Sequence, residues 1–136
     1  MKDRMEVSFL VDDARGLLTA NYSGDFSLAE AEATFLDLLD TLVEHNLKKV
    51  LVDGRQLAGH PEMLERFYYG VFVADAVNRT VNRVKCPVPT FAYVLAEPVL
   101  DPSRFGETVA LNRGMKIKVF DNPQHARWWL GLIDND

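Results

Sequence analysis

The sequence predicts an α/β domain with a mixed five-stranded sheet flanked by helices, in the order ββαβαβαβα. After a first pair of strand-like segments, strands and helices alternate to the end of the chain, which is typical of a parallel sheet with right-handed crossovers. The 136 residues, 48% of them hydrophobic, match the size and composition of one globular domain. We therefore expect a single domain over residues 1–136.

Charge and composition exclude several classes of protein. A net charge of −5 argues against binding to nucleic acid, which requires a basic surface. The single cysteine, Cys86, cannot form an internal disulfide and fits a reducing compartment. The start, MKDRMEVSF, has no apolar stretch of the kind that signal peptides carry. The longest hydrophobic stretch, FYYGVFVA, is too short for a membrane span, so we expect a cytoplasmic protein.

The chain opens with a hairpin followed by an amphipathic helix. Strands are predicted at 6–12 and 17–23, and Gly16 between them supplies the positive φ that a tight hairpin needs. Ser27 and Glu30 form a Ser-x-x-Glu capping box, which predicts a helix start. One face of this helix is apolar and the opposite face is acidic, so the helix should cover a core. The apolar face carries Leu28, Ala31, Phe35, Leu38, Leu39, Leu42 and Val43.

The later elements follow from local signals. Pro61 suits the first position of a helix, because its missing N–H would be unpaired there anyway. Gly114 ends a helix that Asp101-Pro102 opens, and Asn122-Pro123 caps the last helix. Strands are predicted at 48–53, 90–96 and 116–120, and helices at 61–79, 102–113 and from 123, the last with Ala126, Trp129, Leu130 and Ile133 on one face.

The stretch VLVDGRQLAGHPEML, residues 50–64, has the glycine spacing of a phosphate-binding loop but not its chemistry. His60-Pro61 stand where such a loop has the lysine that reaches the phosphates and the hydroxyl that holds magnesium. Pro61 also removes one N–H that a helix start would offer to an anion. We exclude nucleotide hydrolysis and interpret the segment as a structural turn from strand to helix.

No other catalytic or metal-binding pattern is present in the sequence. The histidines, His45, His60 and His125, are far apart and lack the spacing of metal ligands. A G-x-S-x-G motif is absent, and Cys86 has no base near it in the sequence. We therefore predict a protein that is not an enzyme and that uses no metal or cofactor.

A polar group at the end of the third strand leaves two interpretations open. Asp53, Arg55 and His60 follow a predicted parallel strand, and ligands of open α/β sheets tend to bind at that edge. Alternatively, Asp53 accepts hydrogen bonds within its own turn while Arg55 faces solvent. The same segment thus offers a candidate polar site and a purely local explanation.

The predicted helix 61–79 is apolar over more of its circumference than an ordinary covering helix. Met63, Phe67, Val71 and Ala74 form one apolar stripe, and a second stripe lies beside it. Such a helix needs a further surface, which could be a second subunit, a pocket for an apolar ligand, or neighbouring helices. We predict a homodimer or apolar-ligand surface, centred on Phe67, Tyr68, Tyr69, Phe72 and Val73.

Three features together carry a family resemblance: the order of the elements, the strand ending VLVDGR and the closing segment KIKVFDNPQHARWWL. In these the chain resembles the SpoIIAA-like branch of the STAS family over nearly its whole length. The resemblance implies a mixed sheet flanked by helices and no catalysis. Antagonists of anti-sigma factors in this family dock to a protein kinase, and a serine at the start of the helix after the third strand is the phosphorylation switch. Part of the branch also resembles CRAL-TRIO lipid-binding domains.

The chain departs from that family pattern at the switch. The phosphorylated serine would fall near residues 56–59, where the sequence has no hydroxyl, and Tyr68 and Tyr69 lie well inside the helix. We therefore predict a non-catalytic binding module that acts through protein–protein contacts without a phosphoserine switch. The alternative is a carrier or sensor of an apolar ligand such as a lipid, with the helix 61–79 as its lid.

Overall fold

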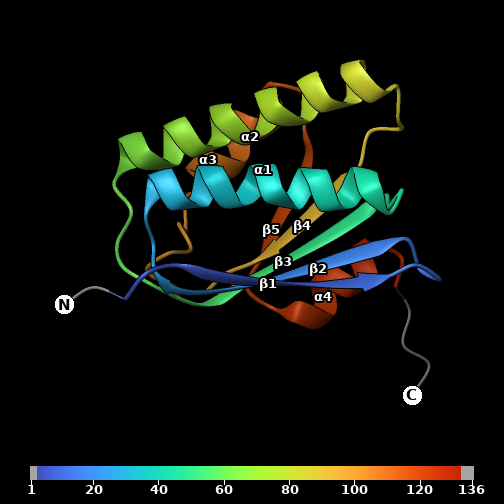
Figure 1. The fold of residues 1–136 in the computed structure, drawn as a ribbon. Helices are drawn as coiled ribbons and strands as arrows, with labels where there is room; N and C mark the ends of the chain where they lie inside the picture. The colour runs from blue at the N-terminus through green and yellow to red at the C-terminus, as the bar shows by residue number, and fades with distance from the viewer. Residues whose placement is uncertain (1–2, 133–136) are drawn as a thin grey trace.

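The computed structural model describes residues 3–132 of the chain. Its elements are β1 (Glu6–Asp12), β2 (Leu17–Asp25), α1 (Leu28–Glu44), β3 (Lys49–Ala58), α2 (Met63–Val84), β4 (Thr90–Val94), α3 (Phe105–Asn112), β5 (Lys116–Phe120) and α4 (Pro123–Trp129). The strands form one sheet in the order β1-β2-β3-β4-β5, with β1 antiparallel to β2 and the other neighbours parallel. Helices α1, α2 and α3 cover one face, and α4 lies on the other (Figure 1). The predicted mixed sheet and element order are confirmed.

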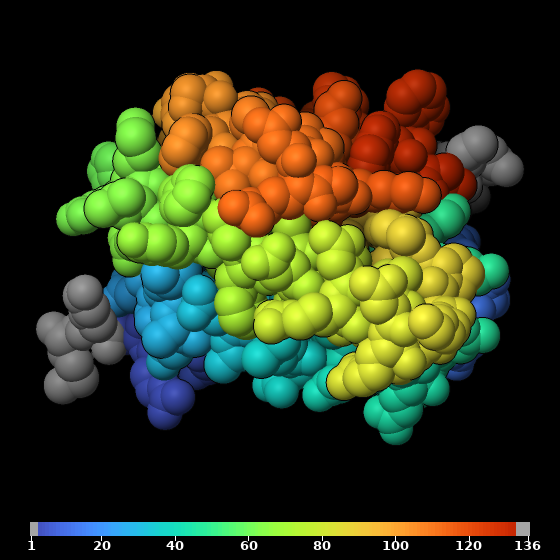
Figure 2. All heavy atoms as spheres, turned by 90° about the horizontal axis from the view of Figure 1, so that it is seen from above, coloured from blue at the N-terminus to red at the C-terminus, as the bar shows by residue number. Residues whose placement is uncertain are grey.

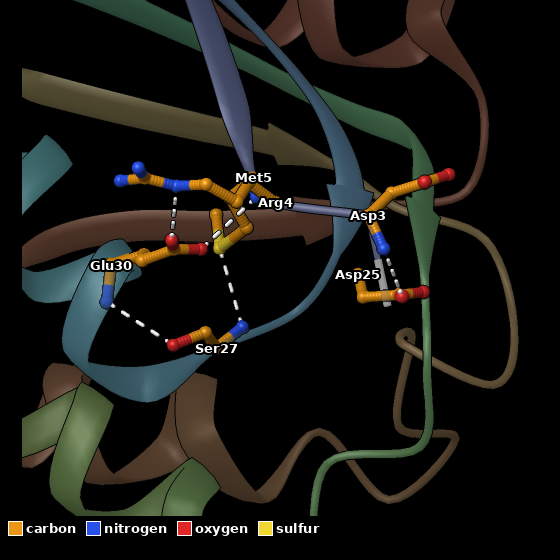
Figure 3. A network of polar contacts seen from close by, with 6 residues as sticks. All are labelled: Asp3, Arg4, Met5, Asp25, Ser27 and Glu30. Atoms are coloured by element: carbon orange, nitrogen blue, oxygen red, sulfur yellow. Dashed lines mark hydrogen bonds and ion pairs between the residues drawn. The ribbon is translucent and has the colours of Figure 1, made fainter. Parts of the chain in front are cut away.

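The local sequence correctly predicted the hairpin at Gly16 and the start of α1 after Ser27. Gly16 has a φ of +63° in the hairpin, as predicted. Ser27 precedes α1, and its hydroxyl accepts a hydrogen bond from the Glu30 N–H at 3.4 Å. Only half of the predicted capping box forms, however, because the Glu30 carboxylate turns to the chain start. It accepts from the Met5 N–H at 3.0 Å and pairs with Arg4 at 3.1 Å (Figure 3).

Two apolar clusters hold the layers together. The larger lies between the sheet and α1–α3, with Phe35 of α1 packed against Phe91 of β4 at 5.6 Å between ring centroids. The smaller lies under α4, where Ala126 and Leu130 are buried as the sequence predicts. Trp128 points away and is 73% exposed, and Ile133, which was predicted on the buried face, lies outside the described residues.

The bounds of β2, β3 and α2 differ from the prediction, and β2 continues to Asp25 and not only to residue 23. Strand β3 continues through Ala58, since residues 56–58 pair with residues 23–25 of β2. The supposed turn from Gly54 to Ala58 is therefore strand, and only residues 59–62 connect it to α2. Helix α2 begins at Met63 and not at Pro61. It continues to Val84, where Lys85 in the left-handed region (φ 58°) ends it, and not to Arg79.

Smaller differences concern β4 and α3. Strand β4 ends at Val94, two residues earlier than predicted. Helix α3 begins at Phe105, because the Asp101 carboxylate accepts the N–H groups of Ser103 (3.1 Å) and Phe105 (3.0 Å) and holds that segment as a turn. The cap of α4 is confirmed, since the Asn122 side chain accepts from the N–H groups of Gln124 and His125.

Candidate binding sites on the two faces of helix α2

Helix α2 is covered on its inner side by the core of the fold and flanked by α1 and α3. It crosses the helical layer between α1 and α3, as seen from above in Figure 2, and its inner residues Val73, Ala74, Ala76 and Val77 are buried. Gly70 lets α3 approach, because a Cβ at this position would lie 2.8 Å from the Gly106 carbonyl oxygen. Packing inside the fold therefore accounts for much of the apolar circumference that the sequence shows.

The five residues predicted to form one surface are divided between the two sides of α2. Val73 is 0% exposed and belongs to the core, and the Tyr69 hydroxyl lies 2.7 Å from the Tyr93 hydroxyl of β4. Phe67 stacks on Phe105 of α3 at 6.5 Å, and Phe72 is partly buried against the core. Only Tyr68 of the five is exposed, at 51%.

The outer side of α2 carries a different group of apolar residues at its start. Met63 is 69% exposed and Leu64 is 62% exposed, and Tyr68 lies one turn after Leu64. We call Met63, Leu64 and Tyr68 the α2 patch. The sequence placed Met63 on one apolar stripe with Phe67, Val71 and Ala74, but only the structure shows that Met63, in the first turn, is left exposed.

A cavity of about 110 Å³ lies beneath the inner side of α2. Its walls come from the sheet, from α2 and α3, and from the segment that carries Met5. They are mostly apolar, and include Met5, Ala31, Val52, Leu57, Val73, Leu95, Val99, Leu100, Ala110, Ile117 and Val119. A pocket for an apolar ligand beneath helix 61–79 was one of the alternatives that the sequence left open, but its lining residues could not be predicted. They are spread over more than a hundred positions and meet only in the folded chain.

Three tyrosines from three elements line the cavity: Tyr22 of β2, Tyr69 of α2 and Tyr93 of β4. The hydroxyls of Tyr69 and Tyr93 are hydrogen-bonded to each other. Among the described residues, the buried Tyr22 hydroxyl has no hydrogen-bond partner. Burial raises the pKa of all three hydroxyls well above the ordinary value of 10, so they remain neutral.

An irregularity in the sheet accompanies the position of Tyr22. The register between β2 and β3 shifts between Asn21 and Ser23, so β3 holds one extra residue opposite Tyr22. Gly54 lies in this part of β3, and a Cβ there would approach the Leu95 Cδ2 atom to 2.6 Å. The first glycine of the apparent phosphate loop therefore serves the packing of Leu95, which lines the cavity.

Charged residues at the edge of the cavity bind the protein's own backbone. Arg66 of α2 donates to the carbonyl oxygens of Val99 (2.7 Å) and Pro98 (3.0 Å), and so ties the loop after β4 to α2. Arg104 donates to the Val119 carbonyl oxygen, and the Glu107 carboxylate accepts from the Val119 N–H. These contacts close the cavity on the side of α3.

The polar group predicted after the third strand is only partly assembled. Arg55 donates to both carboxylate oxygens of Asp53, at 3.0 and 2.7 Å, and its backbone N–H donates to the same side chain at 3.2 Å. The bond from the Arg55 side chain holds the pKa of Asp53 below its usual value. His60 is exposed and has no hydrogen bond or ion pair with any described residue. The local interpretation explains Asp53 and Arg55.

Residues 3–132 contain neither a candidate metal site nor a candidate membrane span. No three His, Cys, Asp or Glu side chains in this range gather in a way that could hold a metal ion. None of the helices in the described part of the chain is both long enough and apolar enough to cross a membrane.

Comparison with known proteins adds a likeness in structure. The crystal structure of an anti-sigma factor antagonist from Mycobacterium paratuberculosis matches this chain with a TM-score of 0.57 and 14% sequence identity. The match covers 95% of this chain and 96% of the other. The fold is SpoIIAA-like. No protein-family model and no curated protein matches the sequence, so the SpoIIAA-like likeness concerns the fold.

Proposed function

We propose that this chain is a non-catalytic binding module that acts by docking another protein onto the α2 patch. The observation that carries the proposal is the concentration of exposed apolar side chains there. Met63, Leu64 and Tyr68 lie within six residues, and each is more than half exposed. Contiguous exposed apolar surface on a soluble protein marks interaction sites, because leaving it in water is unfavourable.

The charges around the α2 patch define the chemistry of the partner. Glu62 and Glu65 flank the patch at the helix start, and the chain as a whole carries −5. The partner should therefore offer an apolar centre with a basic rim. A two-fold contact between copies would bring the acidic rims together, which favours a different protein. The homodimer predicted from the sequence stays a prediction.

The directions of the pKa shifts of carboxylates and tyrosine hydroxyls support binding over catalysis. A carboxyl or tyrosine hydroxyl group serves as a general acid or base at neutral pH when its pKa is shifted towards neutrality. In this chain the shifts of the carboxylates of Asp12, Asp53 and Asp101 are downward, and those of the buried tyrosine hydroxyls are upward, so each moves away from neutrality.

The likeness to an anti-sigma factor antagonist supports protein docking but not a phosphorylation switch. Residues 59–62, which join β3 to α2, read GHPE and contain no hydroxyl. The helix start instead carries fixed carboxylates, with the Glu65 side chain accepting from the Glu62 N–H at 2.9 Å. Docking at the α2 patch would therefore not be switched on or off by phosphorylation of a serine before α2.

Photo-crosslinking in cells that express the protein tests this proposal. A photoreactive phenylalanine analogue placed at Tyr68 should give one predominant crosslinked protein, and Leu64→Glu should remove that product. The matched control carries the same analogue at Trp128. This residue is also a large exposed aromatic side chain, at 73%, but it lies in α4 on the opposite side of the sheet (Figure 1). Identical products from both positions would overturn the proposal, as would retention of the product in Leu64→Glu.

Sedimentation of the purified protein separates the two kinds of partner. A monomer that retains the specific crosslink supports a different protein as partner. A dimer that Leu64→Glu converts to monomer identifies a second copy on the α2 patch and contradicts the preference for a different protein.

The alternative of a lipid carrier is not supported by the size of the cavity. Its volume is about 110 Å³, whereas an engineered cavity of about 150 Å³ in another protein holds benzene. A long acyl chain is much larger than a single ring. An apolar ligand of this chain would therefore have to be small.

A further inference from the structure

We propose that the cavity beneath α2 binds a small, neutral, mainly apolar compound with one polar group, which forms a hydrogen bond with the Tyr22 hydroxyl. This site is separate from the α2 patch, whose three residues are exposed and do not line the cavity. Its occupation does not depend on the proposed docking of a protein.

The unused hydrogen-bonding capacity of the tyrosine cluster carries this inference. Three hydroxyls offer three donors, and the single bond between Tyr69 and Tyr93 uses one of them. Tyr22 brings its hydroxyl into the cavity wall without a partner among the described residues. Buried polar groups are nearly always hydrogen-bonded, because burial without a partner is unfavourable. A bound molecule with an acceptor or a hydroxyl would satisfy Tyr22.

The other polar side chains of the wall are already occupied. Arg66 and Arg104 donate to backbone carbonyl oxygens, and the Asp101 and Glu107 carboxylates accept backbone N–H groups. Tyr22 is thus the one side-chain anchor in the wall without an internal partner among the described residues. The site should accept one polar group and reject a charged one, because no unpaired charge in this wall would compensate the loss of hydration.

Size restricts the ligand further. A cavity of about 110 Å³ is close to the volume that holds a single aromatic ring in another protein. Phe26, Leu57 and Leu95 in the wall are only partly buried, so the lining extends towards the surface. A phenol-sized compound matches both the volume and the single hydrogen bond.

Competing probes test the proposal directly. Titration calorimetry should give phenol a smaller Kd than benzene for the wild type, by roughly three- to tenfold, which is the typical value of one neutral hydrogen bond. Tyr22→Phe keeps the ring and removes the hydroxyl. It should abolish the preference for phenol while benzene binds with an unchanged Kd.

Two controls locate the effect. Tyr68→Phe removes an exposed hydroxyl from the other side of α2 and should leave both Kd values unchanged. Nuclear Overhauser effects from phenol protons to the Tyr22 ring and to the Val73 methyl groups should place the probe in the cavity. These contacts decide the question even if the Tyr22→Phe variant does not fold.

Three results would overturn the proposal. The first is the absence of saturable binding of either probe up to its solubility limit, which would mean a cavity that holds water only. The second is equal affinity of the wild type for phenol and benzene, and the third is an undiminished phenol preference in folded Tyr22→Phe. Leu64→Glu should retain phenol binding, so failure of the docking proposal would leave this result untouched.

Discussion

The hydroxyl groups of Tyr69 and Tyr93 lie 2.7 Å apart and join helix α2 to strand β4 in the wall of the cavity. Their rings also meet edge to face, with centroids 6.3 Å apart. Because both hydroxyls are buried, neither can exchange this bond for one with bulk water. The pair is therefore a specific link between the helical layer and the sheet.

Loss of this bond should be measurable. Tyr93→Phe leaves the Tyr69 hydroxyl buried without its partner, and we expect a loss of about 1–3 kcal/mol in the free energy of unfolding. Urea unfolding followed by circular dichroism measures it. Tyr68→Phe, on the exposed side of the same helix, should change the stability by less than about 0.5 kcal/mol. Equal effects of the two substitutions would show that the Tyr69–Tyr93 bond contributes nothing.

Tyr22→Phe should behave in the opposite way. Its hydroxyl has no partner among the described residues, so its removal should leave the stability unchanged or raise it by up to about 1 kcal/mol. The same urea experiment in the absence of added ligand measures this. A loss as large as that of Tyr93→Phe would mean that an ordered water bonds to Tyr22.

The two sides of α2 should respond differently to substitution. Val73→Ala removes two methyl groups from a fully buried side chain and should destabilise the protein by about 2–3 kcal/mol. Leu64→Glu replaces an exposed residue in the first turn and should change stability by less than about 0.5 kcal/mol. Thermal unfolding of both variants checks this. A large loss in Leu64→Glu would indicate that Leu64 contributes to the fold, and would weaken the α2 patch as a docking surface.

The contact between α2 and α3 requires a residue without a side chain at position 70, which is Gly70. A Cβ at Gly70 would lie 2.8 Å from the Gly106 carbonyl oxygen and 3.1 Å from the Val109 side chain. We expect Gly70→Ala to destabilise the protein by about 1–3 kcal/mol, because the two helices must separate. Gly106→Ala is the matched control, since its nearest contact would be 3.3 Å. Stabilities in urea that fall equally for both variants would contradict a specific role of Gly70.

The pair of Asp53 and Arg55 predicts a modest dependence of stability on pH. The hydrogen bonds from Arg55 lower the pKa of Asp53 in the folded protein, so the pair contributes above the unfolded pKa of about 3.9. That contribution disappears as the pH falls through the folded pKa. Because the pair is partly exposed, Arg55→Ala should cost less than about 1 kcal/mol at pH 7.

Unfolding at pH 7 and at pH 3 measures the Asp53–Arg55 contribution. The difference between wild type and Arg55→Ala should shrink at the lower pH. The exposed Arg79, which makes no ion pair with a described residue, provides the control in Arg79→Ala. A difference that grows as the pH falls would contradict the predicted sign.

The sequence by itself determined the order of the elements and most of their starts. Gly16, Ser27 and Asn122 act through φ angles and hydrogen bonds that involve only neighbouring residues, so their effect can be predicted from the local sequence. The alternation of predicted strands and helices after the hairpin likewise predicted the parallel part of the sheet. The absence of a hydroxyl before α2 is also a property of the sequence alone.

Tertiary structure alone decided where β3 ends, which side of α2 faces water and where the tyrosines meet. Residues 56–58 became strand because β2 pairs with them, and Val73 became core because the sheet covers it. Tyr22, Tyr69 and Tyr93 are far apart in the sequence and share one cavity wall. Strand pairing and side-chain packing bring together residues that are far apart in the sequence. The local periodicity of the sequence does not indicate which distant residues will be in contact.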